Sequence, residues 1–443
     1  MRRKAYTNIM VALVCALLTY VNGKAEGTMP SNIVNGAESD SVRISLVTCY
    51  PGSEIYELYG HSAIRVVIEH SKQTAEGYNV FTPRQDIVFN YGIFSFDEPN
   101  FAYRFAKGVA NYCLEYYPFN YFIAQYKERG SRVEEQVLNL SPEQKQKMLN
   151  LLFENAKEEN KYYRYNYILD NCSTRPRDII EKVVGESLQW GEAGNSEDNT
   201  FRKIMHRYDH NYAWEVLGID LALGHRIDEP ITLREKHFVP MLLEQSLLGA
   251  TMQLNGKRVK VAEAPQVLVD GSVEGNVEDA TPWYIHPLAW ATVLLLITVA
   301  VTVRDYLHTT LSRWYDSILM LLFALLGCVI YFLIFVSVHE ATSPNWVSYW
   351  ANPFYLVPLV LIWIRPAYRV LYWYTYINLS ILVVLLVAGW CLWQDYNEAF
   401  YPLIASMIIR QGYFIYLYRR IFARSAKEPQ ISEEEETDTD NDE

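Results

Sequence analysis

The first half of the chain alternates apolar and polar positions in a way that predicts a soluble domain of mixed strands and helices. A period of two residues predicts strands at Val42–Thr48, Ser62–Ile68 and Asp86–Asn90. Gly77 and Asn79 lie between the last two strands, which indicates an antiparallel hairpin. We therefore expect a sheet in the early part of this domain.

Helical spacing of apolar residues follows. A helix is predicted from Pro142 to about Glu158, because Ser141 and Gln144 form a capping box around a proline at the first helical position. A second helix should cover Ser173–Val184, with a glycine directly after it. The domain thus combines strands and helices in an α+β arrangement.

The rest of the soluble domain is predicted to be mostly helical. Phe201–Ala250 has helical spacing and includes an amphipathic stretch at Leu233–Leu248. Gln253–Gly275 is predicted to be a short hairpin and a linker. We place the whole domain at residues 26–282.

After this domain the apolar residues form long runs. Each run approaches the roughly 20 residues needed to cross a bilayer, except the third, which needs help from Trp346–Trp350. We expect an all-α bundle of about five transmembrane helices at residues 283–420. The five runs are Trp283–Val303, Tyr315–Val338, Pro353–Ile364, Leu371–Trp393 and Phe400–Tyr418.

The loops of the bundle differ in basic residues. Arginines flank the first and third loops and follow the fifth run, whereas His339–Asn352 and Gln394–Glu398 contain neither lysine nor arginine. By the positive-inside rule, residues 26–282 face away from the cytoplasm and the tail at 421–443 lies within it.

The start of the chain is predicted to be a signal peptide. Met1–Lys4 is basic, Ile9–Val21 is a short apolar run, and the small residues Gly23 and Ala25 follow. We assign residues 1–25 to this segment, with an uncleaved signal anchor as the alternative. Both interpretations export the domain that follows.

The net charge of −12 is concentrated at the other end of the chain. Glu433–Glu443 contains eight acidic residues and no basic one. This composition predicts a solvated, disordered tail. No basic stripe suggests nucleic acid, so we expect no nucleic-acid partner.

The cysteines indicate a free thiol in the exported domain. Of the six cysteines, Cys15, Cys328 and Cys391 fall in apolar runs. Three remain in the soluble domain, namely Cys49, Cys113 and Cys172. An odd number leaves at least one unpaired in an oxidising compartment. Pairing of Cys49 with Cys113 would leave Cys172, and all three could equally be free.

Cys172 is the candidate nucleophile. It precedes a predicted helix, and Arg175 and Arg177 follow it closely. A helix N-terminus and nearby cations favour the thiolate, which is the reactive form of cysteine. The alternative is a buried structural cysteine, which the polar neighbours of Cys172 disfavour.

His61 is the candidate general base, because a histidine at the start of a strand can face a thiol at the start of a helix. Gly60–Ala63 partly resembles a serine elbow but lacks its closing glycine and its helix. A third group should orient the imidazole. Asn90 on the partner strand is our first choice, His70 and Asp170 are alternatives, and Asn90 could equally be a strand-end residue.

Two other groups of residues contain histidines that could bind a ligand. His206 and His210 have the spacing of metal ligands, but the HExxH pattern and a third ligand are missing, so we expect no metal. His339 with Glu340 could contact a lipid headgroup, although such loop residues more often cap turns.

Three segments together resemble the family known as the Lnb N-terminal periplasmic domain. They are Gly60–Ala63, Asn90–Phe94 and Asp170–Arg175, and the similarity extends over most of residues 42–260. The membrane half is similar to that of the full-length lipoprotein N-acyltransferases of this family. The resemblance implies a circularly permuted papain-like fold, in the cell inner membrane, with the N-terminal domain in the periplasm.

The resemblance also implies a reaction without a cofactor. Cys172 would attack an acyl ester of a membrane phospholipid while His61 takes the thiol proton. The α-amino group of an S-diacylglyceryl lipoprotein would then attack the thioester. The Cys172 amide would stabilise the oxyanion, Arg175 or Arg177 could hold the phosphate, and Tyr59 and His339 are further candidate substrate contacts.

Two other functions fit the same residues. One is a membrane-anchored cysteine peptidase or amidase that acts on cell-wall peptide with the same catalytic pair. The other is a non-enzymatic membrane scaffold with a degenerate thiol domain.

Overall fold

The structure is a computed structural model. It describes residues 40–52, 57–73, 79–94, 99–271, 280–388 and 394–425. The predicted signal peptide, the turn at Gly77 and the acidic tail lie outside these residues. Contacts divide the chain into two units, of which Ile68–Arg84 belongs to the smaller one and contributes the outer parts of two strands. Asp40 and Ser41, the first two residues of the strand Asp40–Cys49, also belong to the smaller unit, and all other residues described below belong to the larger one.

A seven-stranded sheet forms the centre of the N-terminal domain, in the order β6-β4-β3-β2-β1-β5-β9. The pairs β1–β5, β3–β4, β4–β6 and β5–β9 are antiparallel. The three predicted strands are confirmed as β1, β2 and β3, and each is longer than expected. The strands are β1 (Asp40–Cys49), β2 (His61–Gln73), β3 (Asn79–Ile93), β4 (Asn111–Pro118), β5 (Val133–Val137), β6 (Tyr162–Arg164) and β9 (Gln266–Val269).

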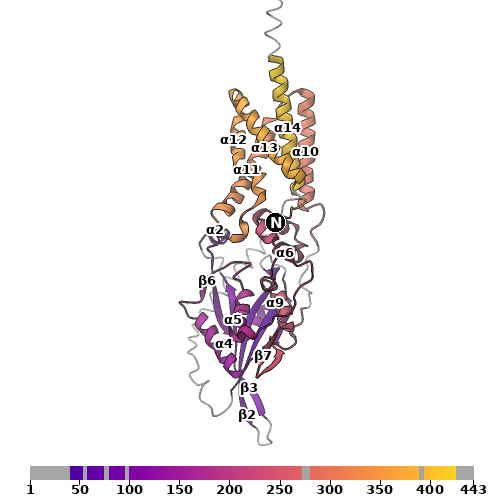
Figure 1. Cartoon of the computed structure of the whole chain (residues 1–443). Helices are drawn as coiled ribbons and strands as arrows, with labels where there is room; N and C mark the ends of the chain where they lie inside the picture. The colour runs from indigo at the N-terminus through magenta and orange to yellow at the C-terminus, as the bar shows by residue number, and fades with distance from the viewer. Residues whose placement is uncertain are drawn as a thin grey trace, which may run out of the picture. The chain divides into compact units, whose positions relative to one another are not determined.

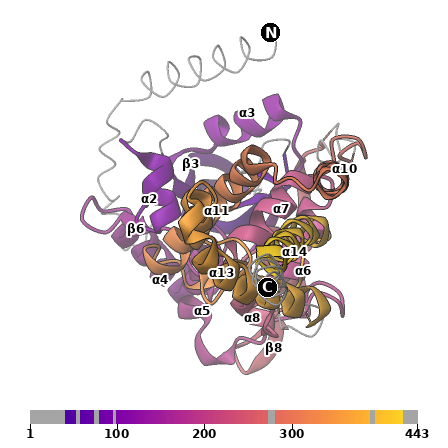
Figure 2. The same cartoon turned by 90° about the horizontal axis from the view of Figure 1, so that it is seen from above.

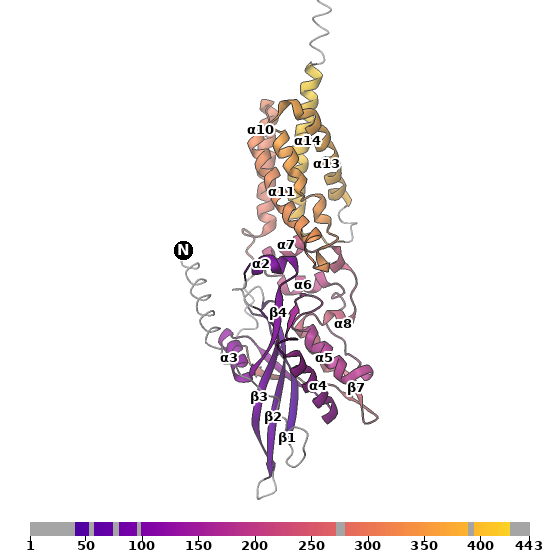
Figure 3. The ribbon, with the colours of Figure 1, turned by 90° about the vertical axis from the view of Figure 1, so that its left-hand side faces the viewer.

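Helices cover both faces of this sheet (Figures 2 and 3). On one side Phe122 of α3 (Phe119–Arg129) packs in a core cluster with Val88. On the other side the ring of Phe153 in α4 (Pro142–Asn155) lies 5.2 Å from that of Phe89. Because Val88 and Phe89 are neighbours on β3, they point to opposite faces of the sheet. The domain is therefore a layered, mixed α/β domain.

The predicted helix starts are confirmed. The side chains of Ser141 and Gln144 each bond the other's backbone N–H, at 3.2 and 2.9 Å, so the capping box of α4 is complete. The second predicted helix is α5 (Thr174–Val184), which ends at Gly185. Short α2 (Phe101–Lys107) precedes β4.

The predicted stretch Leu233–Leu248 is not one helix. It consists of α8 (Leu233–Lys236) and α9 (Pro240–Gly249), because Pro240 lacks a backbone N–H and can only start a new helix. The remaining helices here are α6 (Phe201–Asp209) and α7 (Ala213–Ala222). The hairpin predicted at Gln253–Gly275 forms as β7 (Thr251–Leu254) and β8 (Lys257–Lys260), whereas β9 joins the main sheet.

The C-terminal region is helical (Figure 1). Its longest helices are α10 (Pro287–His308), α11 (Arg313–Phe335), α13 (Tyr368–Ala388) and α14 (Phe400–Ser425), and α14 packs against both α10 and α13. Among the described residues, three helices are long and apolar enough to cross a membrane. They cover Pro287–His308, Arg313–Phe335 and Arg365–Val387.

The third predicted run does not form a full transmembrane helix. Only six of its residues are α-helical, in α12 (Leu356–Leu361). Asn345 and Asn352 cap single 3-10 turns before it, through bonds from the amides of Val347 and Phe354 at 3.0 and 3.2 Å. These side chains and Pro353 favour short turns over a continuous helix, and the aromatic residues of Trp346–Trp350 belong to the turns.

Candidate active site

A side-chain carboxamide shapes the backbone turn that presents Cys172. Asn171 accepts hydrogen bonds from the amides of Ser173 and Thr174, at 2.8 and 2.9 Å. It also donates to the carbonyls of Tyr167 and Phe238, at 2.8 and 3.0 Å. The first amides of α5 are thereby satisfied, and Cys172 lies at the start of the helix as predicted.

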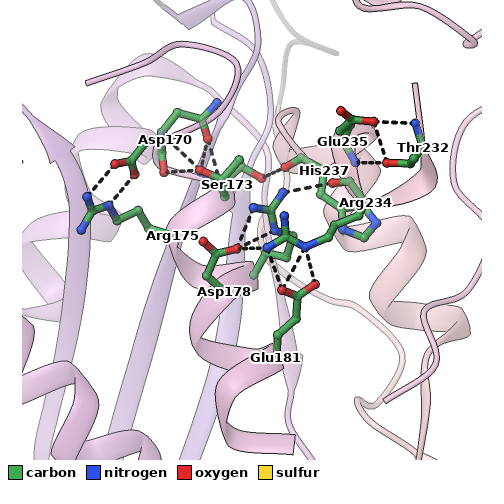
Figure 4. Close-up of polar contacts among 12 residues, drawn as sticks. Asp170, Ser173, Arg175, Asp178, Glu181, Thr232, Arg234, Glu235 and His237 are labelled. Carbon is green, nitrogen blue, oxygen red and sulfur yellow. Dashed lines mark hydrogen bonds and ion pairs between the residues drawn. The ribbon is translucent and has the colours of Figure 1, made fainter. Parts of the chain in front are cut away.

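Hydrogen bonds of the neighbouring side chains also stabilise this turn (Figure 4). The hydroxyl of Ser173 donates to the carbonyl of His237 at 2.7 Å, and Asp170 accepts two bonds from Arg175, at 2.5 and 2.7 Å. Asp170, Asn171 and Ser173 therefore each have hydrogen-bond partners that stabilise the turn around Cys172.

Arg175 and Arg177 both have carboxylate partners. Arg175 pairs with Asp170, and its guanidinium lies 3.7 Å from the ring centre of Tyr163. Arg177 is buried, pairs with Asp178 at 2.6 Å and donates to the carbonyl of Arg234 at 3.0 Å. Both arginines therefore form ion pairs with neighbouring carboxylates, which was the alternative to phosphate binding.

His61 and Asn90 lie together on neighbouring strands. The Nε2 atom of His61, the first residue of β2, is 2.6 Å from Oδ1 of Asn90 on β3. The other end of Asn90, Nδ2, donates to the hydroxyl of Tyr117 on β4 at 2.9 Å. Oδ1 is thus the acceptor, so Nε2 of the imidazole carries the hydrogen and Nδ1 is left for a proton from the thiol.

The thiol and the imidazole form a coupled pair. Burial raises the pKa of the Cys172 thiol, but its hydrogen bond and attraction to His61 outweigh burial and hold the pKa below its ordinary value. Burial lowers the pKa of His61, but the thiolate of Cys172 reverses this effect and the pKa is raised. The backbone N–H of Ser62 also bonds the sulfur. These shifts favour a thiolate facing an imidazolium.

The absence of a side chain at one glycine makes room for Cys172. Gly92, two residues after Asn90, has φ +90°, and a Cβ on it would lie 3.3 Å from the Cβ of Cys172. A side chain at this position would be strained and would crowd the thiol. We did not single out Gly92 or Tyr117 from the sequence. In the sequence only the Asn-Tyr-Gly segment marks Gly92, and no pattern marks Tyr117.

Within the described residues Cys49, Cys113 and Cys172 form no disulfide, and the pairing considered for Cys49 with Cys113 is wrong. These residues lie on β1 and β4, with β2 and β3 between them. Three strand spacings of about 4.8 Å exceed the reach of a disulfide. Burial raises the pKa of Cys49, so its thiol is inert, in contrast to Cys172.

The remaining candidates have hydrogen-bond partners other than this pair. The hydroxyl of Tyr59 donates to Asp209, and His339 is buried with Nε2 2.9 Å from the carbonyl of Phe105. His206 bonds Asp220 at 2.8 Å instead of acting with His210. Of the alternatives to Asn90, Asp170 bonds Arg175, and the side chain of His70 lies outside the described residues.

Both halves of the chain match models of known protein families. Residues 32–207 match the family model of the Lnb N-terminal periplasmic domain, and residues 279–421 match that of the Lnb transmembrane domain. No curated protein and no solved structure matches the chain. The chain is thus a membrane protein with a periplasmic N-terminal domain, and it belongs to the Lnb family.

Proposed function

We propose that this protein is a lipoprotein N-acyltransferase of the inner membrane, with residues 26–282 as its thiol-acyltransferase domain. Cys172 carries the acyl group, His61 moves protons and Asn90 orients the imidazole. The observation that carries the proposal is the Cys172–His61–Asn90 row, with its thiol pKa lowered, in a chain that also contains three helices fit to cross a membrane.

In the first step the thiolate of Cys172 attacks the carbonyl carbon of a phospholipid acyl ester. A carbon–sulfur bond forms, the ester carbon–oxygen bond breaks, and His61 gives its proton to the departing glycerol oxygen. The products are a thioester on Cys172 and a lysophospholipid. The backbone amide of Cys172 would stabilise the oxyanion, and loss of one such donor costs about a hundredfold or more in measured enzymes.

In the second step the α-amino group of an S-diacylglyceryl lipoprotein attacks the thioester. His61, now neutral at Nδ1, takes the proton from the amine. The new amide keeps the acyl chain, and Cys172 leaves as the thiolate. Each cycle therefore returns the thiolate–imidazolium pair without a metal or a redox cofactor.

Contacts between the two halves of the chain support a lipid substrate over a soluble one. The amide of Val338, just beyond α11, donates to the carbonyl of Lys107 at 2.9 Å. Lys107 and Cys172 belong to the same domain, so these contacts hold the thiol domain against the end of a candidate membrane helix. A thiol held close to the bilayer can reach an ester at the membrane surface. This site is a weaker match for a cell-wall peptide, because a soluble hydrolase needs no such bundle.

The test is mass spectrometry of a lipoprotein from cells that carry the wild-type chain or Cys172→Ala. We expect the amide-linked acyl group to be lost in the variant, and a fatty-acid mass on Cys172 of the wild-type protein. Cys113→Ala serves as the matched control, because this thiol lies on β4 and has no place in the mechanism. A peptide-derived adduct on Cys172 would overturn the proposal in favour of a peptidase or amidase, and full N-acylation by Cys172→Ala would favour a scaffold.

A further inference from the structure

Helix α2 is short and has an unusual surface. None of its seven residues is buried, although it contains Phe101, Tyr103 and Phe105. Tyr103 is 51% and Phe105 38% exposed. A single short helix is marginal in water without a buried apolar face. The aromatic surface of α2 therefore requires an apolar neighbour.

The contacts of α2 place it at the end of a candidate membrane helix. The ring of Tyr103 lies 5.7 Å from that of Phe332, in the last turn of the candidate membrane helix α11. A Cβ on Gly108, which ends α2 with φ +76°, would lie 2.9 Å from the Val338 side chain. The end of α2 is thus fitted closely to the segment that follows α11. Aromatic side chains at this depth are typical of membrane interfaces.

A continuous row of aromatic rings leads from α2 to the thiol site. From Phe105 the next ring is Phe101 at 6.1 Å, then Phe94 at 5.2 Å, Tyr112 at 4.9 Å and Tyr165 at 4.0 Å. We call these five residues the aromatic row. Its far end is close to the thiol: Tyr165 directly precedes the Asn166–Asp170 bridge that leads into Cys172, and Phe94 lies two residues after Gly92, which contacts Cys172. In agreement with this position, burial raises the pKa of the Tyr112 and Tyr165 phenols, and the thiolate of Cys172 raises it further.

The aromatic row differs from an ordinary core. Only Tyr112 is buried, and the other four rings are half-buried or exposed. Phe94 follows two residues after Gly92, whose missing side chain makes room for Cys172. A row of partly open rings that begins beside a membrane helix and ends beside a reactive thiol is suited to hold an extended hydrocarbon chain.

We propose that the aromatic row guides the acyl chain of the donor phospholipid from the bilayer surface to Cys172, and that α2 is the positioning element at its entrance. This inference rests on the proposed acyl transfer and adds the route and the residues that recognise the chain. Phe101 and Phe105 are positioning residues, because they contact the chain at a distance from the reacting carbonyl. Their contribution grows with the length of the acyl chain that they cover.

The test compares a membrane donor with a soluble one. Full-length wild type, Phe101→Ala and Phe105→Ala are placed in vesicles of phosphatidylethanolamine and phosphatidylglycerol with palmitoyl chains. Acylation of Cys172 is followed by intact-protein mass spectrometry. A parallel reaction uses p-nitrophenyl butyrate, a soluble ester whose short chain does not extend to α2. We expect the variants to acylate about tenfold more slowly from phospholipid, with unchanged butyryl transfer.

Matched variants separate positioning from folding. Tyr121→Ala removes an aromatic side chain that is 62% exposed on α3, and should change neither reaction. Phe105→Leu keeps an apolar side chain and should restore most of the phospholipid rate. Equal phospholipid rates in wild type and both alanine variants would overturn the inference, as would equal losses with both donors that Phe105→Leu does not repair. If wild type accepts butyrate but no phospholipid, the proposed function itself fails.

Discussion

Two polar regions of the molecule, the thiol site and the surroundings of Arg202, differ in how their hydrogen bonds are used. In the thiol site, Cys172 and His61 remain partly exposed, and the proton between them can reside on the sulfur or on the imidazole. Arg202 is fully buried, and both its charge and its donors are matched. The thiol site can therefore change its protonation state, whereas the surroundings of Arg202 keep theirs.

The Arg202 cluster consists of Arg202, Asp220, Asp228 and Asn397. The guanidinium donates to Asp220 at 2.6 Å, to Asp228 at 2.7 Å and to the carbonyl of Leu223 at 3.0 Å. Asp220 also accepts from Asn397, at 2.9 Å, which belongs to the loop before α14. This saturated cluster therefore joins the periplasmic domain to a loop of the membrane region.

The two regions differ in how many hydrogen-bond partners each polar group has. This number decides whether a polar group stabilises the fold or takes part in chemistry. A buried ion pair with every donor used is costly to break from one side. A thiol with one proton-accepting partner can react as soon as a substrate arrives. Four variants test this contrast, beginning with the largest expected effect.

Arg202→Met should lower the free energy of unfolding by about 3–5 kcal/mol, because buried Asp228 loses its guanidinium partner and buried Asp220 keeps only His206 and Asn397. Denaturant unfolding in detergent micelles, followed by tryptophan fluorescence, measures this change. Lys203→Met is the matched control, since Lys203 is exposed on the same helix. An equal loss in both variants would show that Arg202 has no special structural role.

His61→Gln should slow alkylation of Cys172 by iodoacetamide about a hundredfold at pH 7, because the thiol pKa would rise without the imidazolium. In the wild type the Cys172 pKa is lowered, so reactivity should persist below the ordinary thiol range and disappear as the pH falls through that lowered pKa. In the variant it should appear only at alkaline pH. Cys113 provides the internal control, and identical pH profiles for Cys172 in both proteins would contradict the ion pair.

Asp209→Asn should stabilise the protein at pH 8 by about 2 kcal/mol and have little effect near pH 3, below the ordinary pKa of about 4 for an aspartate. Burial raises the pKa of Asp209 to about 6, above its value in an unfolded chain. The wild type is therefore most stable below the unfolded pKa and loses this contribution as the pH rises through about 6. Thermal unfolding midpoints across this range measure the effect, and a difference independent of pH would speak against it.

Asn90→Ala should slow formation of the acyl-enzyme about tenfold, because the His61 ring loses the bond that selects its tautomer. Asn90→Asp keeps an oxygen acceptor toward Nε2 and should retain most of the rate. The measurement is the pH dependence of Cys172 acylation by p-nitrophenyl butyrate. If Asn90→Ala and Asn90→Asp behave alike, the orienting role of the oxygen is wrong.

The sequence alone was sufficient for features with a local cause. The capping box at Ser141, the start of α5 after Cys172 and the strand that begins at His61 each depend on a few neighbouring residues. Periodicity also located the membrane helices α10, α11 and α13. It failed for the third apolar run, because apolar composition does not reveal that Asn345 and Asn352 cap short turns.

The tertiary structure decided which distant residues meet. The sequence named Cys172, His61 and, as the first choice for the third group, Asn90, but left His70 and Asp170 as alternatives. Only the pairing of β2, β3 and β4 brings the Asn90 oxygen to His61 and its nitrogen to Tyr117. The same strand order separates Cys49 from Cys113. Strand order depends on long-range packing, which no local pattern records. The sequence could therefore name the thiol and its candidate partners, and only the fold decides which of these candidates meet.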